Sequence, residues 1–285
     1  MIQFVNAKLN LGLNIVRKRE DGYHLLETIF YPVGLYNGTP ENPDPFCDIL
    51  EVIPAGDNVG ENRYFWSGRK IDCPLEKNLV YRAAELITEE TGRYFDLYLE
   101  KYLPDGAGLG GGSADASFTL KALNEISGRT IPDARLKEMA LSLGADCPFF
   151  IDNIPAYGEG IGEILTPVEQ RLKGMWCVIV KPDVYVSTRE AFAGITPHPS
   201  ATSLRDVYSR PVSVWREFMH NDFEESIFPQ HPELAVIKQQ LYGHGAIYAQ
   251  MSGSGSSIFG LFDDVRMAKK CREAFVDLPT YLSLL

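Results

Sequence analysis

A glycine-rich stretch between residues 104 and 113 is the segment of this sequence whose composition most clearly suggests chemistry. It reads PDGAGLGGGS and stands between a strand-like run and a helix-like run. Glycines allow several backbone N–H groups to converge, and a helix N-terminus adds about half a positive charge. The stretch therefore predicts a phosphate-binding loop, with Ser113 as a helix cap or a further donor to phosphate. A hinge or tight turn without a ligand is the alternative.

The surroundings of this loop limit which kind of phosphate loop it can be. Gly106, Gly108 and Gly111 spell G-x-G-x-x-G, the fingerprint of dinucleotide-binding folds. That fingerprint follows a buried first strand and precedes an acidic residue about 20 positions on, at the end of a second strand. Here Pro104 ends the preceding run, and the positions near 131 read as a loop. A P-loop is excluded, because no G-K-[ST] follows the glycines.

Three other polar residues, Lys8, Asn10 and Asp146, are candidates for the functional site because of their positions in the sequence. Lys8 and Asn10 lie on the polar side of an alternating segment whose apolar side spans residues 9–15. On its own, Lys8 is typical of a solvated edge lysine, and Asp146, which follows a predicted helix, is typical of a turn cap. The SGSGSS segment at 252–257 is typical of a hairpin turn, although a second row of N–H donors could close over a phosphate chain.

The elements that must position these residues show no regular βαβ rhythm, which favours an α+β fold over a doubly wound one. A segment rich in glycine and proline, AYGEGIGEILTP, suggests a junction near 158 and hence two domains, 1–158 and 159–285. Strands are predicted at 9–15, 25–36, 48–53, 94–104, 176–182, 246–251 and 256–262, and helices at 76–90, 113–127, 132–144, 233–243 and 264–276.

The overall composition excludes several classes of protein. A length of 285 residues fits about two domains. The net charge of −11 argues against binding to nucleic acid or to anionic lipid through global charge. Five scattered cysteines without a C-x-x-C pair fit neither a disulfide framework nor a zinc site. With no signal peptide and no apolar run long enough to span a bilayer, the predicted location is cytoplasmic.

Four segments together resemble the GHMP kinase superfamily, and the resemblance runs from about Ala7 to Phe262. The combination of K-L-N-L with D-G-Y-H resembles the branch that acts on a cytidyl-erythritol alcohol of the non-mevalonate isoprenoid pathway. The resemblance implies a two-domain α+β GHMP kinase fold. The N-terminal domain would resemble domain 2 of ribosomal protein S5, and the C-terminal domain would be ferredoxin-like, with the active site in the cleft between them. The four segments are AKLNLGLNIVRKREDGYHLLETIF, PDGAGLGGGSADAS, GADCPFF and AYGEGIGEIL.

The resemblance also implies an activity and its residues. ATP would donate its γ-phosphoryl to the 2-hydroxyl of the erythritol, with Mg²⁺ accompanying the nucleotide. No metal ligand is assigned, and Ser113 is only a weak candidate. Lys8 and Asp146 correspond to the catalytic residues. The residues that would contact the substrate are Asn10, Tyr23, His24 and Phe192. The ring of Tyr23 would stack on cytosine, His24 would hydrogen-bond the edge of the base, and Phe192 would be a second aromatic residue. ATP would meet Pro104, Asp105, Gly106, Ala107, Gly108, Leu109, Gly110, Gly111, Gly112, Ser113 and Ala114, together with Asn78 and Lys101.

The sequence departs from the family pattern in three places. Ala114 stands where a second serine is usual, so a hydroxyl contact to phosphate or metal is lost while the backbone N–H remains. Cys147 stands where an apolar residue is usual, and it is expected to pack as a small hydrophobe. The loop at 37–47 is long for the family, and no function is predicted for it.

Several alternatives remain open on the sequence alone. Within the superfamily, the acceptor could be of the homoserine or mevalonate type. From another class, the G-x-G-x-x-G match allows a nicotinamide-dependent oxidoreductase. A nucleotide-binding module without catalysis is a third possibility, which the presence of both Lys8 and Asp146 argues against. The expected partners are ATP and the small-molecule substrate, without nucleic acid or membrane, and the chain is expected to be a monomer or a weak homodimer.

Overall fold

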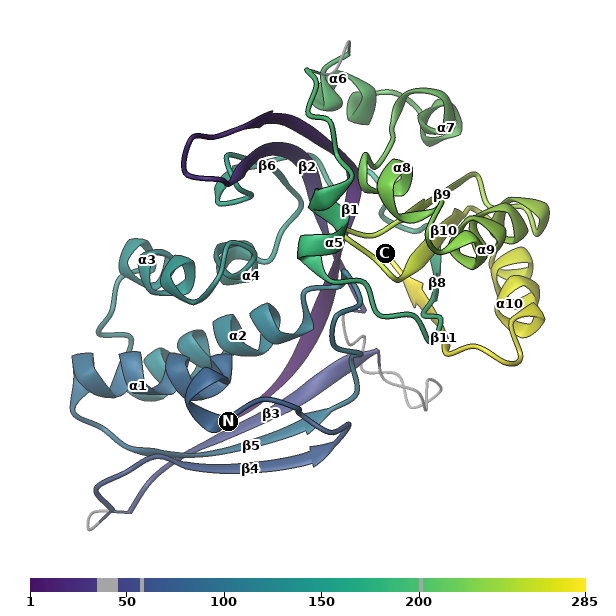
Figure 1. Ribbon diagram of the computed structural model, residues 1–285. Coiled ribbons are helices and arrows are strands. Elements are labelled where there is room, and N and C mark those ends of the chain that lie inside the picture. The colour runs from purple at the N-terminus through teal and green to yellow at the C-terminus, as the bar shows by residue number, and fades with distance from the viewer. Residues whose placement is uncertain (35–45, 57–58, 200–201) are drawn as a thin grey trace. The chain divides into compact units, whose positions relative to one another are not determined.

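Strand β1 (Ile2–Lys18) belongs to both of the units into which the chain divides. The computed structural model describes residues 1–34, 46–56, 59–199 and 202–285 (Figure 1). Unit 1 comprises Met1–Ala7, Leu35–Asp105 and Gly110–Asn153, and unit 2 comprises Lys8–Gly34, Gly106–Leu109 and Ile154–Leu285. Because the chain passes between the units several times, they are not consecutive halves. The boundary at 158 stays a prediction.

Unit 1 is a sheet with helices on one side of it (Figure 1). The beginning of β1 pairs antiparallel with β3, β3 pairs antiparallel with β5, and β4 runs parallel to β5 at the edge. Helix α1 is amphipathic and buries Val80, Ala83, Ala84 and Ile87, the i, i+3, i+4, i+7 spacing of one helix face. The elements are β3 (Cys47–Pro54), β4 (Arg63–Gly68), η1 (Leu75–Lys77), α1 (Leu79–Thr91), β5 (Phe95–Lys101), α2 (Gly111–Ile126), α3 (Asp133–Leu143) and α4 (Cys147–Asp152).

Unit 2 contains two groups of strands. In the first, β1 lies beside β2 (His24–Val33), which pairs antiparallel with β6 (Ala156–Glu159), and β6 pairs with β7 (Ile164–Pro167). The second is an antiparallel sheet of order β11-β8-β10-β9, packed against α9 and α10. This order is ferredoxin-like, as expected. Its strands and helices are β8 (Trp176–Val180), β9 (Tyr248–Met251), β10 (Ile258–Phe262), β11 (Thr280–Leu284), α9 (Pro232–Gly243) and α10 (Val265–Ala274).

The strands and helices predicted from periodicity are all present, and those that were missed are short. Because they span three to six residues, they carry too little periodicity to be recognised. The junction rich in glycine and proline is the hairpin β6–β7. The other missed elements are β4, β11, α4, α5 (Thr188–Ala193), α6 (Leu204–Ser209), η2 (Val212–Val214), α7 (Trp215–Phe218) and α8 (Phe223–Ile227).

Two further expectations from the sequence concern the loop at 37–47 and the absence of a membrane-spanning segment. Most of the long loop at 37–47 lies outside the described residues. Within the described ranges, no helix combines the length and the apolar character that crossing a bilayer requires.

Candidate functional site

The predicted phosphate loop joins β5 to α2, as the sequence indicates. Its residues are shared between the units, with Gly106–Leu109 in unit 2 and the flanking residues in unit 1. Gly106, Gly108 and Gly110 all have positive φ, and Gly110 occupies the N-cap position of α2. Residues alternating between left- and right-handed conformations direct successive N–H groups to one side, the arrangement that binds anions. Positive φ at every second residue supports the predicted anion-binding role of the loop, which stays a prediction.

Gly108 is where the loop touches the second small-residue segment, Ser252–Ser257. Gly108 has φ of +73°, and a Cβ on it would overlap the carbonyl oxygen of Ser252. Ser252 Oγ donates to the Gly108 carbonyl at 2.8 Å, and Ser257 N donates to Ala107 O at 3.2 Å. The 252–257 segment does connect the hairpin strands β9 and β10, as its composition suggests. It also fixes the backbone of the glycine loop.

Lys8 is buried rather than solvated, which corrects the simplest interpretation of its place in an alternating strand. Its backbone N–H donates to Leu109 O at 2.9 Å. Its ammonium donates to Asn10 Oδ1 at 2.5 Å and to Gly108 O at 3.2 Å, and it lies 5.4 Å from the centre of the Phe30 ring. An ammonium held at a phosphate loop can balance the charge of a transferred phosphoryl group.

Asn10 connects Lys8 to the strand next to it. Its amide Nδ2 donates to Thr28 Oγ1 at 3.1 Å, and Thr28 Oγ1 in turn donates to Gly12 O at 2.6 Å. The backbone N–H of Asn10 also donates to Ser252 Oγ at 3.3 Å. With its oxygen on Lys8, Asn10 thus fixes the lysine side chain from β1 itself.

The residues predicted on the substrate side fall at one end of β2. His24 begins β2 and stacks on Phe192 of α5, with ring centroids 4.6 Å apart and planes 16° apart. Tyr23 immediately precedes His24 and is 61% exposed. The structure therefore brings together two of the predicted aromatic side chains and leaves the ring of Tyr23 at the surface.

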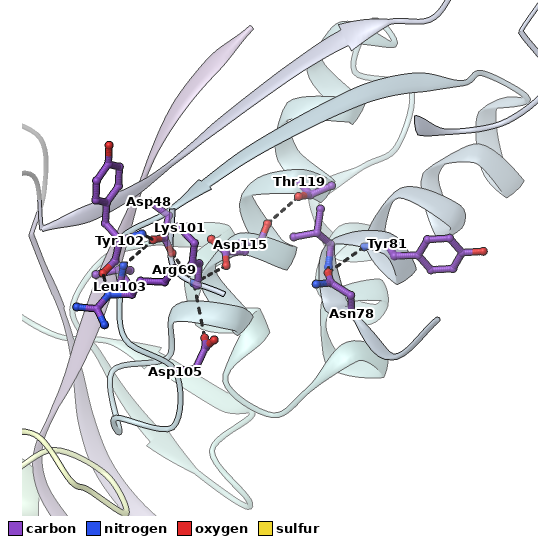
Figure 2. Close-up of polar contacts among 11 residues, drawn as sticks. Asp48, Arg69, Asn78, Tyr81, Lys101, Tyr102, Leu103, Asp105, Asp115 and Thr119 are labelled. Carbon is purple, nitrogen blue, oxygen red and sulfur yellow. Dashed lines mark hydrogen bonds and ion pairs between the residues drawn. The ribbon is translucent and has the colours of Figure 1, made fainter. Parts of the chain in front are cut away.

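Asn78 and Lys101, which the resemblance places near the nucleotide, both have structural partners in unit 1. Asn78 caps α1, where its Oδ1 accepts from Val80 N at 2.8 Å and from Tyr81 N at 3.4 Å. Lys101 forms ion pairs with Asp48 at 2.5 Å and Asp115 at 2.7 Å, and Figure 2 shows its ammonium between these carboxylates. Their contact with ATP stays a prediction.

Asp146 occupies the N-cap position of α4, but its carboxylate does not cap that helix. Its interpretation as a turn cap and its catalytic role both stay predictions. The next residue, Cys147, is fully buried, and burial raises the pKa of its thiol to about 11. Cys147 packs as the small hydrophobe that was expected. Asp146 lies in unit 1 and Lys8 in unit 2, and their approach to each other stays a prediction.

Three partners of the predicted residues were missed from the sequence. Asp48 and Asp115 flank Lys101, and Ser252 bonds the glycine loop. An aspartate at the start of a strand or inside a helix is ordinarily exposed, so no local pattern marks these two as buried. The signal available for Ser252 was its place in the second glycine-serine segment.

The side chains of the described residues do not form a cluster of metal ligands by themselves. No group of three or more histidine, cysteine, aspartate or glutamate side chains within the described residues could hold a metal ion. The five cysteines are unpaired, and four of them are buried.

Comparison with protein families gives two matches. The description "GHMP kinases N terminal domain" matches residues 78–155, and "GHMP kinases C terminal" matches residues 207–277. The first match contains the glycine loop, α2 and Asp146. The second lies within the part of unit 2 that includes α9, β9 and β10.

Several curated relatives cover nearly the whole chain. A protein of Bacteroides fragilis is 52% identical over 263 residues, covering 92% of each chain. A protein of Bacteroides thetaiotaomicron is 48% identical over 264 residues, again covering 92% of each chain. A third, from Chlorobium phaeobacteroides, is 37% identical over 279 residues, covering 94% of this chain and 91% of its own. All three are named 4-diphosphocytidyl-2-C-methyl-D-erythritol kinase.

Solved structures agree with these relatives. A crystal structure of 4-(cytidine 5'-diphospho)-2C-methyl-D-erythritol kinase has a TM-score of 0.77 at 30% identity, covering 99% of this chain and 98% of its own. A homoserine kinase from Cytophaga hutchinsonii has a TM-score of 0.66 at 17% identity, covering 98% and 94%. The second likeness shows that the fold is shared.

Proposed function

This chain belongs to the GHMP kinase family, within its branch of 4-diphosphocytidyl-2-C-methyl-D-erythritol kinases, and we propose how its residues carry out that reaction. The reaction is the ATP-dependent phosphorylation of the 2-hydroxyl of 4-(cytidine 5'-diphospho)-2-C-methyl-D-erythritol in the non-mevalonate isoprenoid pathway. One observation carries the assignment of the site. The ammonium of Lys8 donates to Gly108 O, which joins the expected catalytic lysine to the expected phosphate loop.

The glycine loop binds the triphosphate of ATP through its backbone. The positive φ values at Gly106, Gly108 and Gly110 support this role, because they turn N–H groups toward one anion. The N-terminus of α2, with Ser113 in its first turn, adds the partial positive charge of a helix end. Ala114 contributes no hydroxyl, so its role is limited to its backbone N–H.

Lys8 and Asp146 act on the transferred group. In the step, a bond forms between the acceptor 2-oxygen and Pγ, and the bond from Pγ to the β,γ-bridging oxygen breaks to release ADP. The transition state is loose, so charge balance and positioning matter more than a strong base. Lys8 offsets the charge on the γ-phosphoryl. Asp146 orients the alcohol and accepts its proton late in the transfer.

The cytidyl part of the substrate meets the aromatic residues at the start of β2. The exposed ring of Tyr23 offers a face on which cytosine stacks, and His24 offers a ring nitrogen to the edge of the base. Phe192 supports the histidine ring through the observed stacking. Asn10 binds the same substrate through its amide, next to Lys8.

Mg²⁺ bound together with the nucleotide would supply charge neutralisation on the phosphates. Mg²⁺ commonly keeps several waters and takes its remaining ligands from one or two carboxylates and from phosphates. The Ser113 hydroxyl, in the first turn of α2, is the protein group that would hold it. This proposal fits a site that lacks a ready-made cluster of metal ligands among the described residues.

The location and partners of the protein stay predictions. The net charge of −11 supports the expectation that neither nucleic acid nor anionic membrane is a partner. We also propose that the protein is cytoplasmic and is a monomer or a weak homodimer, as expected in the sequence analysis.

The test is a coupled assay of ADP release with the cytidyl alcohol, homoserine and mevalonate, each supplied separately with ATP and Mg²⁺. Turnover with the cytidyl alcohol alone is the expected result. Preferential turnover of homoserine or mevalonate would reassign the acceptor. Binding of NADH in a titration, without any response to ATP, would indicate an oxidoreductase in place of a kinase.

A further inference from the structure

A buried cluster of charges lies directly behind the phosphate loop, entirely within unit 1. Lys101, the last residue of β5, forms ion pairs with Asp48 of β3 at 2.5 Å and with Asp115 of α2 at 2.7 Å (Figure 2). The exposed fractions of these side chains are 2%, 0% and 4%. A third carboxylate, that of Asp105, lies 3.9 Å from the ammonium and is more than half exposed.

The cluster holds the segment that leads into the loop. Asp48 Oδ1 accepts hydrogen bonds from Tyr102 N at 2.6 Å and from Leu103 N at 2.7 Å. Its other oxygen binds Lys101. A single buried carboxylate therefore fixes three consecutive residues at the end of β5, immediately before Pro104.

The cluster also holds the segment that leaves the loop. Asp115 lies one turn into α2, and its Oδ2 accepts from Lys101 Nζ. The ammonium reaches so close to the start of this helix that a Cβ on Gly111 would lie 3.2 Å from it. Both ends of the phosphate loop are therefore attached to one ammonium group.

Stability alone is a weak reason for such a cluster. Two buried carboxylates face one ammonium, and replacement of buried ion pairs by apolar groups is often neutral or stabilising. Burial and the neighbouring Asp48 raise the pKa of Asp115 well above its usual range, although Lys101 opposes this. Among the described residues, Asp115 Oδ1 has no hydrogen-bond partner. These costs suggest that the cluster serves the geometry of the loop.

We propose that Asp115 is a positioning residue for ATP, which acts through Lys101 to fix both ends of the phosphate loop without touching the nucleotide. The inference rests on the proposed function of the loop. It also gives Lys101 a different role from the direct contact with ATP that the resemblance implies.

Two substitutions at Asp115 separate positioning from a simple effect of charge. Asp115→Ala removes both the charge and the bond to Lys101. Asp115→Asn removes the charge but keeps an amide oxygen that can accept from the ammonium. If the carboxylate acted through its field, both variants would bind the anionic nucleotide more tightly than the native chain, and to a similar degree. If it acts through position, only the alanine variant is impaired.

The measurement is calorimetric titration of the full-length chain with a non-hydrolysable ATP analogue and Mg²⁺, followed by KM and kcat for both substrates. Asp115→Ala should raise Kd for the analogue and KM for ATP about tenfold or more, because small displacements of a binding loop are costly. Asp115→Asn should restore both to within about threefold, since position is kept. KM for the cytidyl alcohol should stay unchanged in both variants.

Thr119→Val is the matched control for a loss of packing in the same helix. Thr119 is fully buried one turn beyond Asp115, and its hydroxyl donates to the Asp115 carbonyl at 2.7 Å. This variant should lower the unfolding temperature and leave Kd for the analogue unchanged.

If Asp115→Ala does not fold, Asp48→Asn replaces it. That variant keeps an oxygen as acceptor for Tyr102 and Leu103 but turns an amide NH2 toward the Lys101 ammonium, so the bond to Lys101 is lost. The same selective loss of nucleotide affinity is therefore expected.

The outcomes of these titrations distinguish the positioning role of Asp115 from the proposed function of the chain. Equal behaviour of the alanine and asparagine variants, or lower thermal stability with native nucleotide affinity, would overturn the positioning role. The native chain provides a separate check on the proposed function, because a kinase for any acceptor must bind the nucleotide. Native binding with unaffected variants therefore rejects only the role of the cluster, whereas no native binding rejects both.

Discussion

The imidazole of His24 lies stacked on the ring of Phe192, with centroids 4.6 Å apart, although the two residues come from distant parts of the chain. One begins β2 and the other lies in α5, and both belong to unit 2. Burial first, and then the positive charge of Lys18, lower the pKa of His24 below 6.5. His24 is therefore neutral at pH 7, which suits hydrogen bonding to the edge of an uncharged base.

This lowered pKa predicts a pH dependence for substrate binding. The native state favours neutral His24, so its contribution to stability is complete above pH 6.5 and is lost as the pH falls through the lower folded pKa. KM for the cytidyl alcohol should rise over the same range, while KM for ATP stays flatter. In His24→Gln, the rise in this window should disappear. Identical profiles for the native chain and the variant would exclude His24 from base recognition.

The exposed ring of Tyr23 predicts a selective effect on the cytidyl substrate. Loss of a stacking platform costs about 1–3 kcal/mol per base, so Tyr23→Ala should raise KM for that substrate about 5- to 160-fold. KM for ATP should change far less. Tyr98→Ala, at an exposed tyrosine of β5, is the control and should alter neither constant. Equal increases in both KM values for Tyr23→Ala would show that the ring is not a base platform.

Replacement of the proposed catalytic carboxylate should separate chemistry from binding. Asp146→Asn keeps the size of the side chain and removes the proton acceptor, so kcat should fall about 100- to 10,000-fold. Affinity for ATP should stay within a few-fold of native. Asp152→Asn, at the other end of α4, disrupts a surface ion pair with Lys137 and should retain native turnover. Near-native kcat in Asp146→Asn would remove this residue from the mechanism.

The close approach of the two glycine segments predicts that Gly108 does not tolerate a side chain. In Gly108→Ala, a Cβ would overlap Ser252 O at a φ of +73°. The free energy of unfolding should fall by about 2 kcal/mol or more, and affinity for ATP should fall with it.

Gly112→Ala provides the comparison for that prediction. Gly112 lies in α2, and the nearest atom to a Cβ there is 4.0 Å away, on Leu79. Its stability should stay native or rise by up to about 1 kcal/mol, because alanine favours helix. Denaturant unfolding of the two variants is the measurement. Similar stabilities would mean that the contact between the glycine segments is unimportant.

The parts of the fold that were predictable are those that carry a repeating pattern. The spacing in α1 follows from burial of one face, and the glycine stretch marks the turn into α2. The alternation around Lys8 predicted the strand, but residues 5–15 of β1 are buried on both faces. The residues of the site were named through resemblance, since spacing alone made Lys8 an edge lysine. The structure instead buries it against Asn10 and Gly108.

What could not be predicted depends on contacts between residues distant in sequence. The burial of Asp48 and Asp115 around Lys101 arises from the packing of α2 on the sheet. Neither aspartate stands in a sequence pattern that distinguishes it from a surface residue. Ser252 bonds Gly108 for a similar reason, because the hairpin β9–β10 meets the loop only in the folded chain.

Identification of the product tests the central claim most directly. The native chain should be incubated with ATP, Mg²⁺ and 4-(cytidine 5'-diphospho)-2-C-methyl-D-erythritol, and the product examined by phosphorus and carbon NMR. One new phosphomonoester on the 2-oxygen of the erythritol is expected for each ADP formed, and Lys8→Met should form almost none. Formation of ADP without phosphorylation of the alcohol, or a phosphate on another oxygen, would contradict the account.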